Sequence, residues 1–165
     1  MESRIGKIVV GGLRKMKKFI ALVSLSFLVM FSSLFTNTSS TEAAGNSKLL
    51  ITEAKKLIGT PYRYGGTTPK GFDCSGFVYY THKKIGKILP RTSKQMYQKG
   101  KTVHKSNLRA GDLVFFNTSK TKTDVSHVAI YIGNNQVIHA TSKGVKIDSL
   151  NNSYWKSKYV GAKRL

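Results

Sequence analysis

Residues 126–140 read SHVAIYIGNNQVIHA, and they predict a β-hairpin because two apolar runs flank the turn residues Gly133-Asn134-Asn135. A loop of these three residues places His127 and His139 on one face of the hairpin as diagonal neighbours. The Val and Ile side chains then share the other face. A two-residue loop would instead place His139 among those apolar side chains. The hydrophobic pattern therefore favours the register that pairs the histidines over the alternative of two unrelated ones.

The elements around this hairpin indicate one α+β domain, with helices first and an antiparallel sheet after them. The predicted helices run from a Ser47 cap to about Leu57, from an Asp73 cap to about Ile85, and from Thr92 towards Gln98. Strands are predicted at residues 113–116, 125–132, 136–140, 145–147 and 159–162. Eight Phe and eight Tyr residues can supply a core, so disorder is excluded.

Cys74 is the single cysteine, which excludes an internal disulfide and a cysteine zinc cluster. Asp73 precedes it as a predicted N-cap, so the sulfur lies in the first turn of a helix. Free amides there favour a thiolate nucleophile. Gly76 leaves room for the close approach of a backbone or ligand. The alternative is an inert, buried cysteine, which is the commoner fate of a single one.

A thiol nucleophile needs a base that a third group orients, and the chain has four histidines. His82 lies beside Lys83 and Lys84 in the predicted helix, and we interpret it as a solvated surface residue. His104 lies in a basic loop without an evident partner. His127 and His139 lie in strands on one face and are the candidates.

These segments resemble the NlpC family of bacterial cell-wall cysteine endopeptidases from about residue 54 to residue 140, which is most of the chain after the predicted signal peptide. The matching segments, in order, are Gly59-Thr60-Pro61-Tyr62 with Gly65-Gly66, Asp73-Cys74-Ser75-Gly76-Phe77, Leu89-Pro90-Arg91-Thr92-Ser93, Ala110-Gly111-Asp112-Leu113-Val114-Phe115-Phe116, Ser126 to Gly133, and Ile138-His139-Ala140. One such tetrapeptide would be weak evidence, whereas six in the right order are specific. The resemblance implies a papain-like fold, in which N-terminal helices carrying the cysteine pack on a sheet carrying the histidines.

The resemblance also implies a Cys-His-His triad. Cys74 would be the nucleophile, His127 the general base, and His139 the residue that orients His127. No metal or other cofactor is implied. The reaction would be hydrolysis of an amide in a peptidoglycan stem peptide through a thioester, typically between D-glutamate and the diamino acid at position three. An amidase or acyl transferase on the same fold, a lysin aimed at competitors, and a non-enzymatic cationic wall-binding protein are the alternatives.

Four further residues receive roles from the resemblance. Tyr62 would line the oxyanion region, while the nearby Tyr64 is expected to be a packing aromatic. Asp73 and Ser75 would help to bind the peptide. Arg91 would either contact a substrate carboxylate or fix its loop. By contrast, Asp112 is expected to shape the turn before its strand.

Residues 1–44 are interpreted as a signal peptide, with Met16 as an alternative start. A basic stretch ending at Lys18 precedes the charge-free run from Phe19 to Phe35, and a polar stretch ending in Ala43-Ala44 follows. The run of about 17 residues is at the lower limit for a membrane span, so an uncleaved anchor is the alternative. Cleavage would leave residues 45–165 as one catalytic domain, secreted or wall-associated, without a stable membrane anchor.

The chain carries 28 basic and 7 acidic side chains, a formal charge of +21. Residues 1–44 contain six of the basic and two of the acidic ones, so residues 45–165 retain +17. Such a charge favours anionic partners, which outside a cell are cell-wall polymers and membrane surfaces. The export signal, the even spread of basic residues and the absence of a nucleic-acid motif exclude nucleic acid as the partner.

Overall fold

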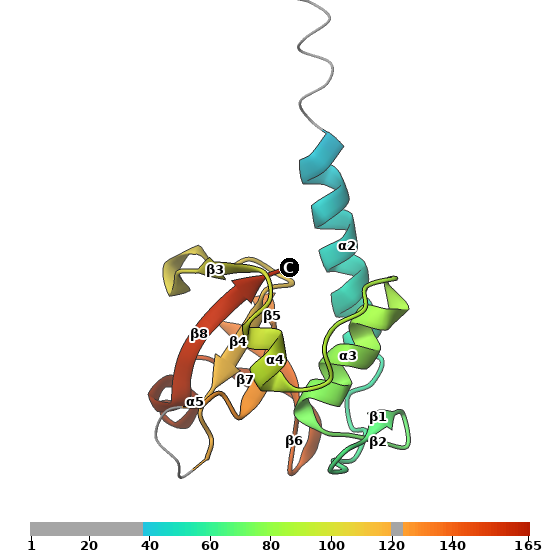
Figure 1. Cartoon of the computed structure of the whole chain (residues 1–165), viewed down its shortest axis with the longest axis vertical. Coiled ribbons are helices and arrows are strands. Elements are labelled where there is room, and N and C mark those ends of the chain that lie inside the picture. Colours follow the sequence, from blue (N-terminus) through green and yellow to red (C-terminus); the bar gives the residue numbers. More distant parts are fainter. Residues whose placement is uncertain (1–37, 120–123) are drawn as a thin grey trace, which may run out of the picture. The chain divides into compact units, whose positions relative to one another are not determined.

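The computed structural model describes residues 38–119 and 124–165, with side chains from residue 44 onward (Figure 1). The chain divides into two units, Met1–Ala43 and Ala44–Leu165, and the fold below is that of the second. Most of the predicted signal peptide, including its apolar run from Phe19 to Phe35, lies outside the described residues. Within the described ranges, no helix is long and apolar enough to span a membrane.

The described elements confirm the α+β class. The helices are α2 (Thr38–Lys55), α3 (Cys74–Lys84), α4 (Ser93–Tyr97), the 3₁₀ helix η1 (Lys105–Asn107) and α5 (Ser153–Lys158). Strands β1 (Thr67–Thr68) and β2 (Gly71–Phe72) form a small antiparallel pair. The main strands are β3 (Lys101–Val103), β4 (Leu113–Phe116), β5 (His127–Gly133), β6 (Gln136–Thr141), β7 (Gly144–Ser149) and β8 (Tyr159–Arg164). They form one antiparallel sheet in the order β3-β8-β4-β5-β6-β7.

Capping residues set the starts of α3 and α4 as predicted, whereas the predicted start of the first helix is wrong. Asp73 and Thr92 are the N-caps of α3 and α4 as predicted, accepting hydrogen bonds from the amides of Gly76 and Gln95. Ser47 was predicted to cap the first helix, but α2 begins at Thr38 and Ser47 lies inside it. The prediction was wrong because a Ser with a favourable sequence context does not stop a helix that continues through the residues before it.

The hairpin of β5 and β6 has the predicted register, reached by a different turn. Ile130 pairs with Ile138 and Tyr131 with Val137, as a three-residue loop requires. The turn itself has two residues, Asn134 and Asn135, both at positive φ (49° and 55°). Between Tyr131 and Gly133 the register shifts by a β-bulge. The bulge supplies the extra residue and restores the register that places the histidines on one face.

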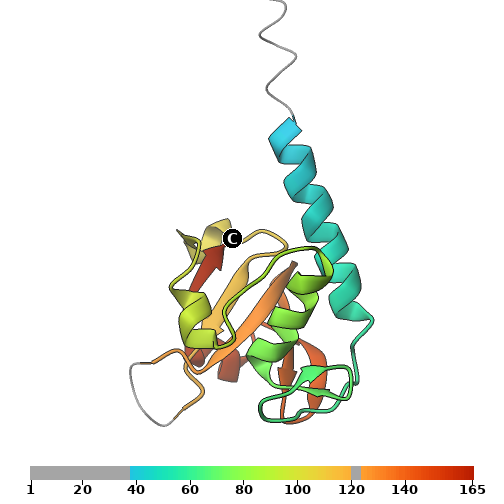
Figure 2. The same ribbon diagram turned by 45° about the vertical axis from the view of Figure 1, so that its right-hand side comes forward.

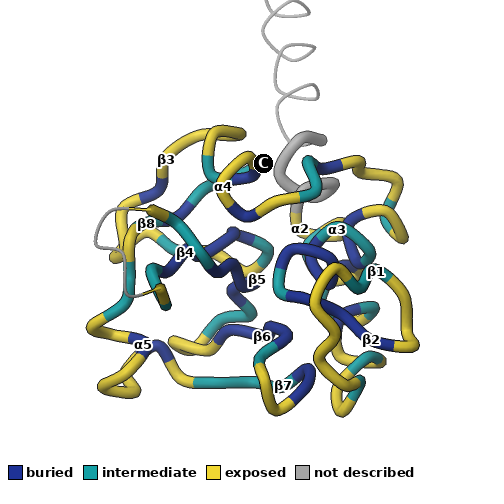
Figure 3. The backbone as a smooth tube through the Cα atoms, turned by 60° about the horizontal axis from the view of Figure 1, so that its bottom comes forward, coloured by how far each residue is buried: buried dark blue, intermediate teal, exposed yellow. Residues whose placement is uncertain are grey.

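The two faces of the sheet pack against different parts of the chain. One face carries Val128, Ile130, Ile138 and Ala140, and it forms a core with Phe77 of α3. Figure 2 shows α3 beside the sheet, where it packs against β5 and β6. The second core, on the histidine face, contains Val114, Phe116, Ala129, Tyr131, Val137 and Trp155. Figure 3 shows the resulting buried segments along β5 and β6.

Candidate active site

Cys74 is the first residue of α3, where the Asp73 cap fixes the chain. The Oδ1 atom of Asp73 accepts a hydrogen bond from the Gly76 amide at 2.7 Å. Gly76 is required here, because a Cβ at this position would lie 1.9 Å from the Gly66 carbonyl oxygen. The close approach predicted for Gly76 is therefore an approach of backbone. It anchors the start of α3 against the loop of residues 59–66.

Burial raises the pKa of the Cys74 thiol above its usual 9.0, although backbone hydrogen bonds from Val128, Ser75 and Cys74 itself act in the opposite direction. The first-turn position was expected to favour a thiolate. The amides do lower the pKa, but the cost of desolvating the charge is larger. The thiol therefore needs a neighbouring base to ionise it.

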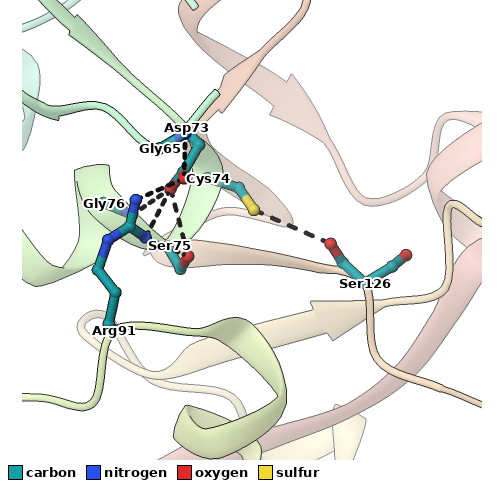
Figure 4. A network of polar contacts seen from close by, with 7 residues as sticks. All are labelled: Gly65, Asp73, Cys74, Ser75, Gly76, Arg91 and Ser126. Atoms are coloured by element: carbon teal, nitrogen blue, oxygen red, sulfur yellow. Dashed lines mark hydrogen bonds and ion pairs between the residues drawn. The ribbon is translucent and has the colours of Figure 1, made fainter. Parts of the chain in front are cut away.

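The fold brings this thiol beside the start of β5. The Sγ atom of Cys74 lies 3.9 Å from the carbonyl oxygen of Ser126, the residue directly before His127 (Figure 4). Helix α3 and strand β5 thus place Cys74 against the residue that precedes His127 in the chain.

His127 and His139 contact each other directly, as the hairpin register predicted. The Nε2 atom of His127 lies 3.0 Å from the Nδ1 atom of His139, and both rings are buried. Burial lowers the pKa of both imidazoles, so they are neutral at neutral pH. Since Nε2 of His127 faces His139, its Nδ1 atom is the ring nitrogen that this contact leaves unused.

Two residues that the sequence analysis missed complete this cluster. The Nε2 atom of His139 lies 3.0 Å from Oδ2 of Asp148, and the Nε1–H of Trp155 donates to the same oxygen at 3.0 Å. The Trp155 ring stacks on His127, with centroids 5.2 Å apart. Asp148 lies on β7 opposite Val137, which makes it a diagonal neighbour of His139 on the same face. Extending the predicted strand of residues 145–147 by one residue would have revealed it.

A second polar network surrounds the helix start (Figure 4). Arg91 donates from Nη1 to Asp73 Oδ1 at 2.9 Å, from Nη2 to Asp73 Oδ2 at 2.6 Å, and from Nη1 to Ser75 Oγ at 2.9 Å. The Gly65 amide donates to Asp73 Oδ2 at 3.0 Å. Of the two roles considered for Arg91, these contacts support fixing the loop, because both terminal nitrogens are engaged.

The two tyrosines of the preceding loop differ in exposure. Tyr62 is 40% exposed, and its backbone forms a bridge with Phe72, directly before the Asp73 cap. Partial burial, followed by the proximity of Cys74 and Asp73, raises the pKa of the Tyr62 hydroxyl above 10.0, so it is a hydrogen-bond donor at neutral pH. Tyr64 is 91% exposed. Its prediction as a packing aromatic was wrong, because the glycine-rich loop turns this side chain towards solvent.

The other polar residues considered from the sequence lie outside the histidine cluster and make local contacts. His82, predicted to be solvated, is only 2% exposed and its Nδ1 atom lies 2.8 Å from the Val78 carbonyl oxygen. The prediction failed because the adjacent lysines lie on other faces of the helix. His104 is exposed and contacts Ser106. Asp112 shapes its turn as predicted, accepting a hydrogen bond from the Arg109 amide. In the described part of the chain, no group of three His, Cys, Asp or Glu side chains is arranged to hold a metal ion.

Comparison with known proteins identifies the family. Residues 59–164 match the NlpC/P60 family, and the chain belongs to it. It is 49% identical over 119 residues to the probable peptidoglycan endopeptidase LytE of Bacillus subtilis, covering 72% of this chain and 34% of that protein. It is 42% identical over 154 residues to the gamma-DL-glutamyl hydrolase of the same organism, covering 90% of this chain and 37% of that protein.

Solved structures of the family share the fold. A crystal structure of an NlpC/P60 family protein from Bacillus cereus superposes with a TM-score of 0.68 and 39% identity, covering 72% of this chain and 39% of that one. The NlpC/p60 domain of the peptidoglycan hydrolase SagA gives a TM-score of 0.62 and 34% identity, covering 72% of this chain and 98% of that domain. The chain spans only about a third of the two Bacillus subtilis relatives. Its papain-like α+β fold is that of the family.

Proposed function

We propose that this protein is a cysteine endopeptidase that hydrolyses amide bonds in the stem peptides of peptidoglycan. The 3.0 Å contact between His127 and His139, beside the only cysteine, is the observation that carries the proposal. The names of the relatives, a probable peptidoglycan endopeptidase and a gamma-DL-glutamyl hydrolase, support the substrate class. By the family resemblance, the bond cut is the one between the side-chain carboxyl of D-glutamate and the diamino acid at position three.

In the proposed mechanism, His127 accepts the thiol proton and Cys74 attacks the amide carbon. Because burial keeps His127 neutral at neutral pH, its imidazole has a lone pair that can accept this proton. Tyr62 and the Cys74 amide would stabilise the oxyanion. His127 then protonates the leaving amine, which leaves a thioester. Water, deprotonated by His127, attacks this thioester and releases the acid.

Asp73 and Ser75 are proposed to help bind the part of the peptide that precedes the scissile bond. Asp73 accepts five hydrogen bonds, from Gly65, Ser75, Gly76 and twice from Arg91. It is therefore rigid, and the guanidinium compensates its charge. A substrate amine could share this carboxylate only at a fixed position, which would favour one peptide register over others.

The protein is also proposed to be exported and to stay near the wall by charge. Residues 1–44 have the order of a signal peptide, and residues 45–165 carry +17. Attraction between exposed lysines and anionic polymers is screened over about 8 Å at physiological ionic strength. Retention on purified walls should therefore fall as salt rises. Retention that does not change between low and high salt would contradict a charge-based interaction.

Digestion of purified peptidoglycan, analysed by mass spectrometry, tests the activity. The chain is compared with Cys74→Ala and with His104→Ala, which removes an exposed histidine outside the cluster. New fragments ending at D-glutamate, produced by the chain and by His104→Ala but not by Cys74→Ala, are the expected result. Products joined to an added amine would indicate an acyl transferase. A folded, reduced protein that binds walls but cleaves neither sacculi nor soluble stem peptides would indicate a wall-binding role.

A further inference from the structure

The cluster behind the histidines has a defined direction of hydrogen bonding. An indole N–H can only donate, so Trp155 makes Oδ2 of Asp148 an acceptor at 3.0 Å. The other oxygen, Oδ1, lies 2.8 Å from Nζ of Lys146, which also can only donate. Both oxygens of Asp148 therefore accept hydrogen bonds from these neighbours, and neither oxygen donates one.

The charge of Asp148 agrees with this direction. Burial raises the pKa of its carboxyl, but hydrogen bonds from Lys146, His139 and Trp155 outweigh burial and leave the pKa below 3.8. The group is a carboxylate at neutral pH and can only accept. The Nε2 atom of His139, 3.0 Å from Oδ2, must therefore carry the proton of that contact.

This proton determines the state of both imidazoles. A neutral imidazole has one N–H, so a proton on Nε2 of His139 leaves its Nδ1 bare as an acceptor. The donor across the 3.0 Å contact is then Nε2–H of His127. His127 has its single proton on Nε2, and its Nδ1 atom is bare on the side left for Cys74.

We propose that Asp148, held by Trp155, is a positioning residue that sets the tautomers of His139 and His127 so that Nδ1 of His127 can accept the Cys74 proton. Its catalytic consequence rests on the function proposed above. In the step concerned, the S–H bond breaks, its electron pair stays on sulfur, and the proton bonds to Nδ1. Without Asp148, the direction of the hydrogen bond between His139 and His127 can reverse. His139 then donates from Nδ1, His127 carries its proton on Nδ1, and the thiol has no acceptor.

Two double variants test the proposal with opposite expectations. In Asp148→Asn with Lys146→Met, only Trp155 requires an acceptor, so the amide oxygen faces Trp155 and His139. The tautomers should stay as Nε2–H. In Asp148→Asn with Trp155→Phe, Lys146 draws the oxygen to its own side, and the amide NH₂ faces His139. The histidines should then change to Nδ1–H.

Nitrogen-15 NMR reads these tautomers directly, without substrate and whether or not the protein is a peptidase. The chain itself should show Nε2–H on both histidines. A wrong tautomer in a nucleophile–histidine–carboxylate triad costs about 10⁴ in kcat. Since Asp148 acts through a second imidazole, we expect the Phe double variant to lose about 10²-fold in the alkylation rate of Cys74 and in stem-peptide hydrolysis. The Met double variant should stay within about tenfold of the chain.

Asp112→Asn is the matched control, because Asp112 is likewise a carboxylate in an ion pair, with Arg164, but it does not contact the histidines. It should leave the tautomers unchanged. An Nδ1–H form of His139 in the unsubstituted chain would overturn the proposal. So would the same tautomer in both folded double variants. Should either double variant not fold, Asp148→Leu takes its place: it leaves Nε2 of His139 without an acceptor on this side, so its tautomer ratio must differ from that of the chain, and an unchanged ratio would overturn the proposal. Correct tautomers in a chain that hydrolyses nothing would refute the proposed function but not this assignment.

Discussion

Replacing His82 with leucine should make the protein more resistant to acid. His82 is 2% exposed in α3. Burial, helped by nearby Lys87, lowers the pKa of its imidazole from 6.5 to about 4, although the contact with the Val78 carbonyl acts in the opposite direction. An unfolded chain protonates this side chain below pH 6.5, whereas the folded chain does not until about pH 4. The neutral histidine therefore favours unfolding progressively as pH falls between these values.

The magnitude follows from the two pKa values. One pKa unit corresponds to about 1.4 kcal/mol, so the gap between 6.5 and about 4 gives a loss of about 2.5 kcal/mol between pH 7.5 and pH 4.5. Leucine removes the titration and keeps an apolar side chain of similar size. Its cost at pH 7.5 is the contact with the Val78 carbonyl, about 1 kcal/mol, because that oxygen also accepts the backbone bond of the helix.

Urea denaturation at pH 7.5, 6.0 and 4.5 measures the effect for the chain, His82→Leu and the exposed-histidine control His104→Leu. We expect the free energy of unfolding of His82→Leu to fall by about 2.5 kcal/mol less than that of the chain across this range. His104→Leu should follow the chain, because that side chain is exposed. Parallel curves for the chain and His82→Leu would refute the reasoning.

Three other changes have expected outcomes. Arg91→Met removes guanidinium donors that lower the pKa of Asp73, so unfolding by acid should begin at a higher pH. The free energy of unfolding at pH 7 should fall by about 2 kcal/mol, less than for a fully buried ion pair because Arg91 is partly exposed. An acid titration followed by circular dichroism measures this. Gly76→Ala places a methyl group 1.9 Å from the Gly66 carbonyl oxygen and should lower the free energy of unfolding by about 3 kcal/mol or prevent folding. In Gly45→Ala the added methyl group meets nothing within 4 Å, so that variant should keep the stability of the chain. Urea denaturation compares the two. Asn135→Gly relieves a positive φ of 55° and should raise Tm by about 2 °C in a thermal melt, and a lower Tm would show that the side chain contributes to the turn.

The paired histidines could be predicted because alternation along a strand has a period of two. A shift by one residue would have buried His139 among apolar side chains, so the pattern permitted one register. The bulge between Tyr131 and Gly133 could not be predicted in the same way, since a bulge and a longer loop give the same register beyond the turn. The histidine face was therefore predicted correctly with an incorrect turn.

The parts that sequence reasoning missed depend on neighbours that are distant in the chain. His82 is buried because other segments of the chain pack against its side of α3. The adjacent lysines lie on other sides of the helix, so they do not indicate whether His82 is buried. Trp155 reaches the histidines only because the short helix α5, capped by Asn152, lies against the sheet. Asp148 was within reach of the strand pattern, but the predicted strand ended one residue too early.

Cys74 and the paired histidines lie on segments that are far apart in the sequence. Cys74 begins α3, and it meets the start of β5 at Ser126, 52 positions further on. Closing a loop of this length costs entropy that is recovered only when helix and sheet pack together. A nascent or unfolded chain therefore holds the thiol apart from the histidines, and they come together only in the cooperative step that completes the fold. Under the proposed function, the timing of folding would thus restrain hydrolysis until the domain is complete.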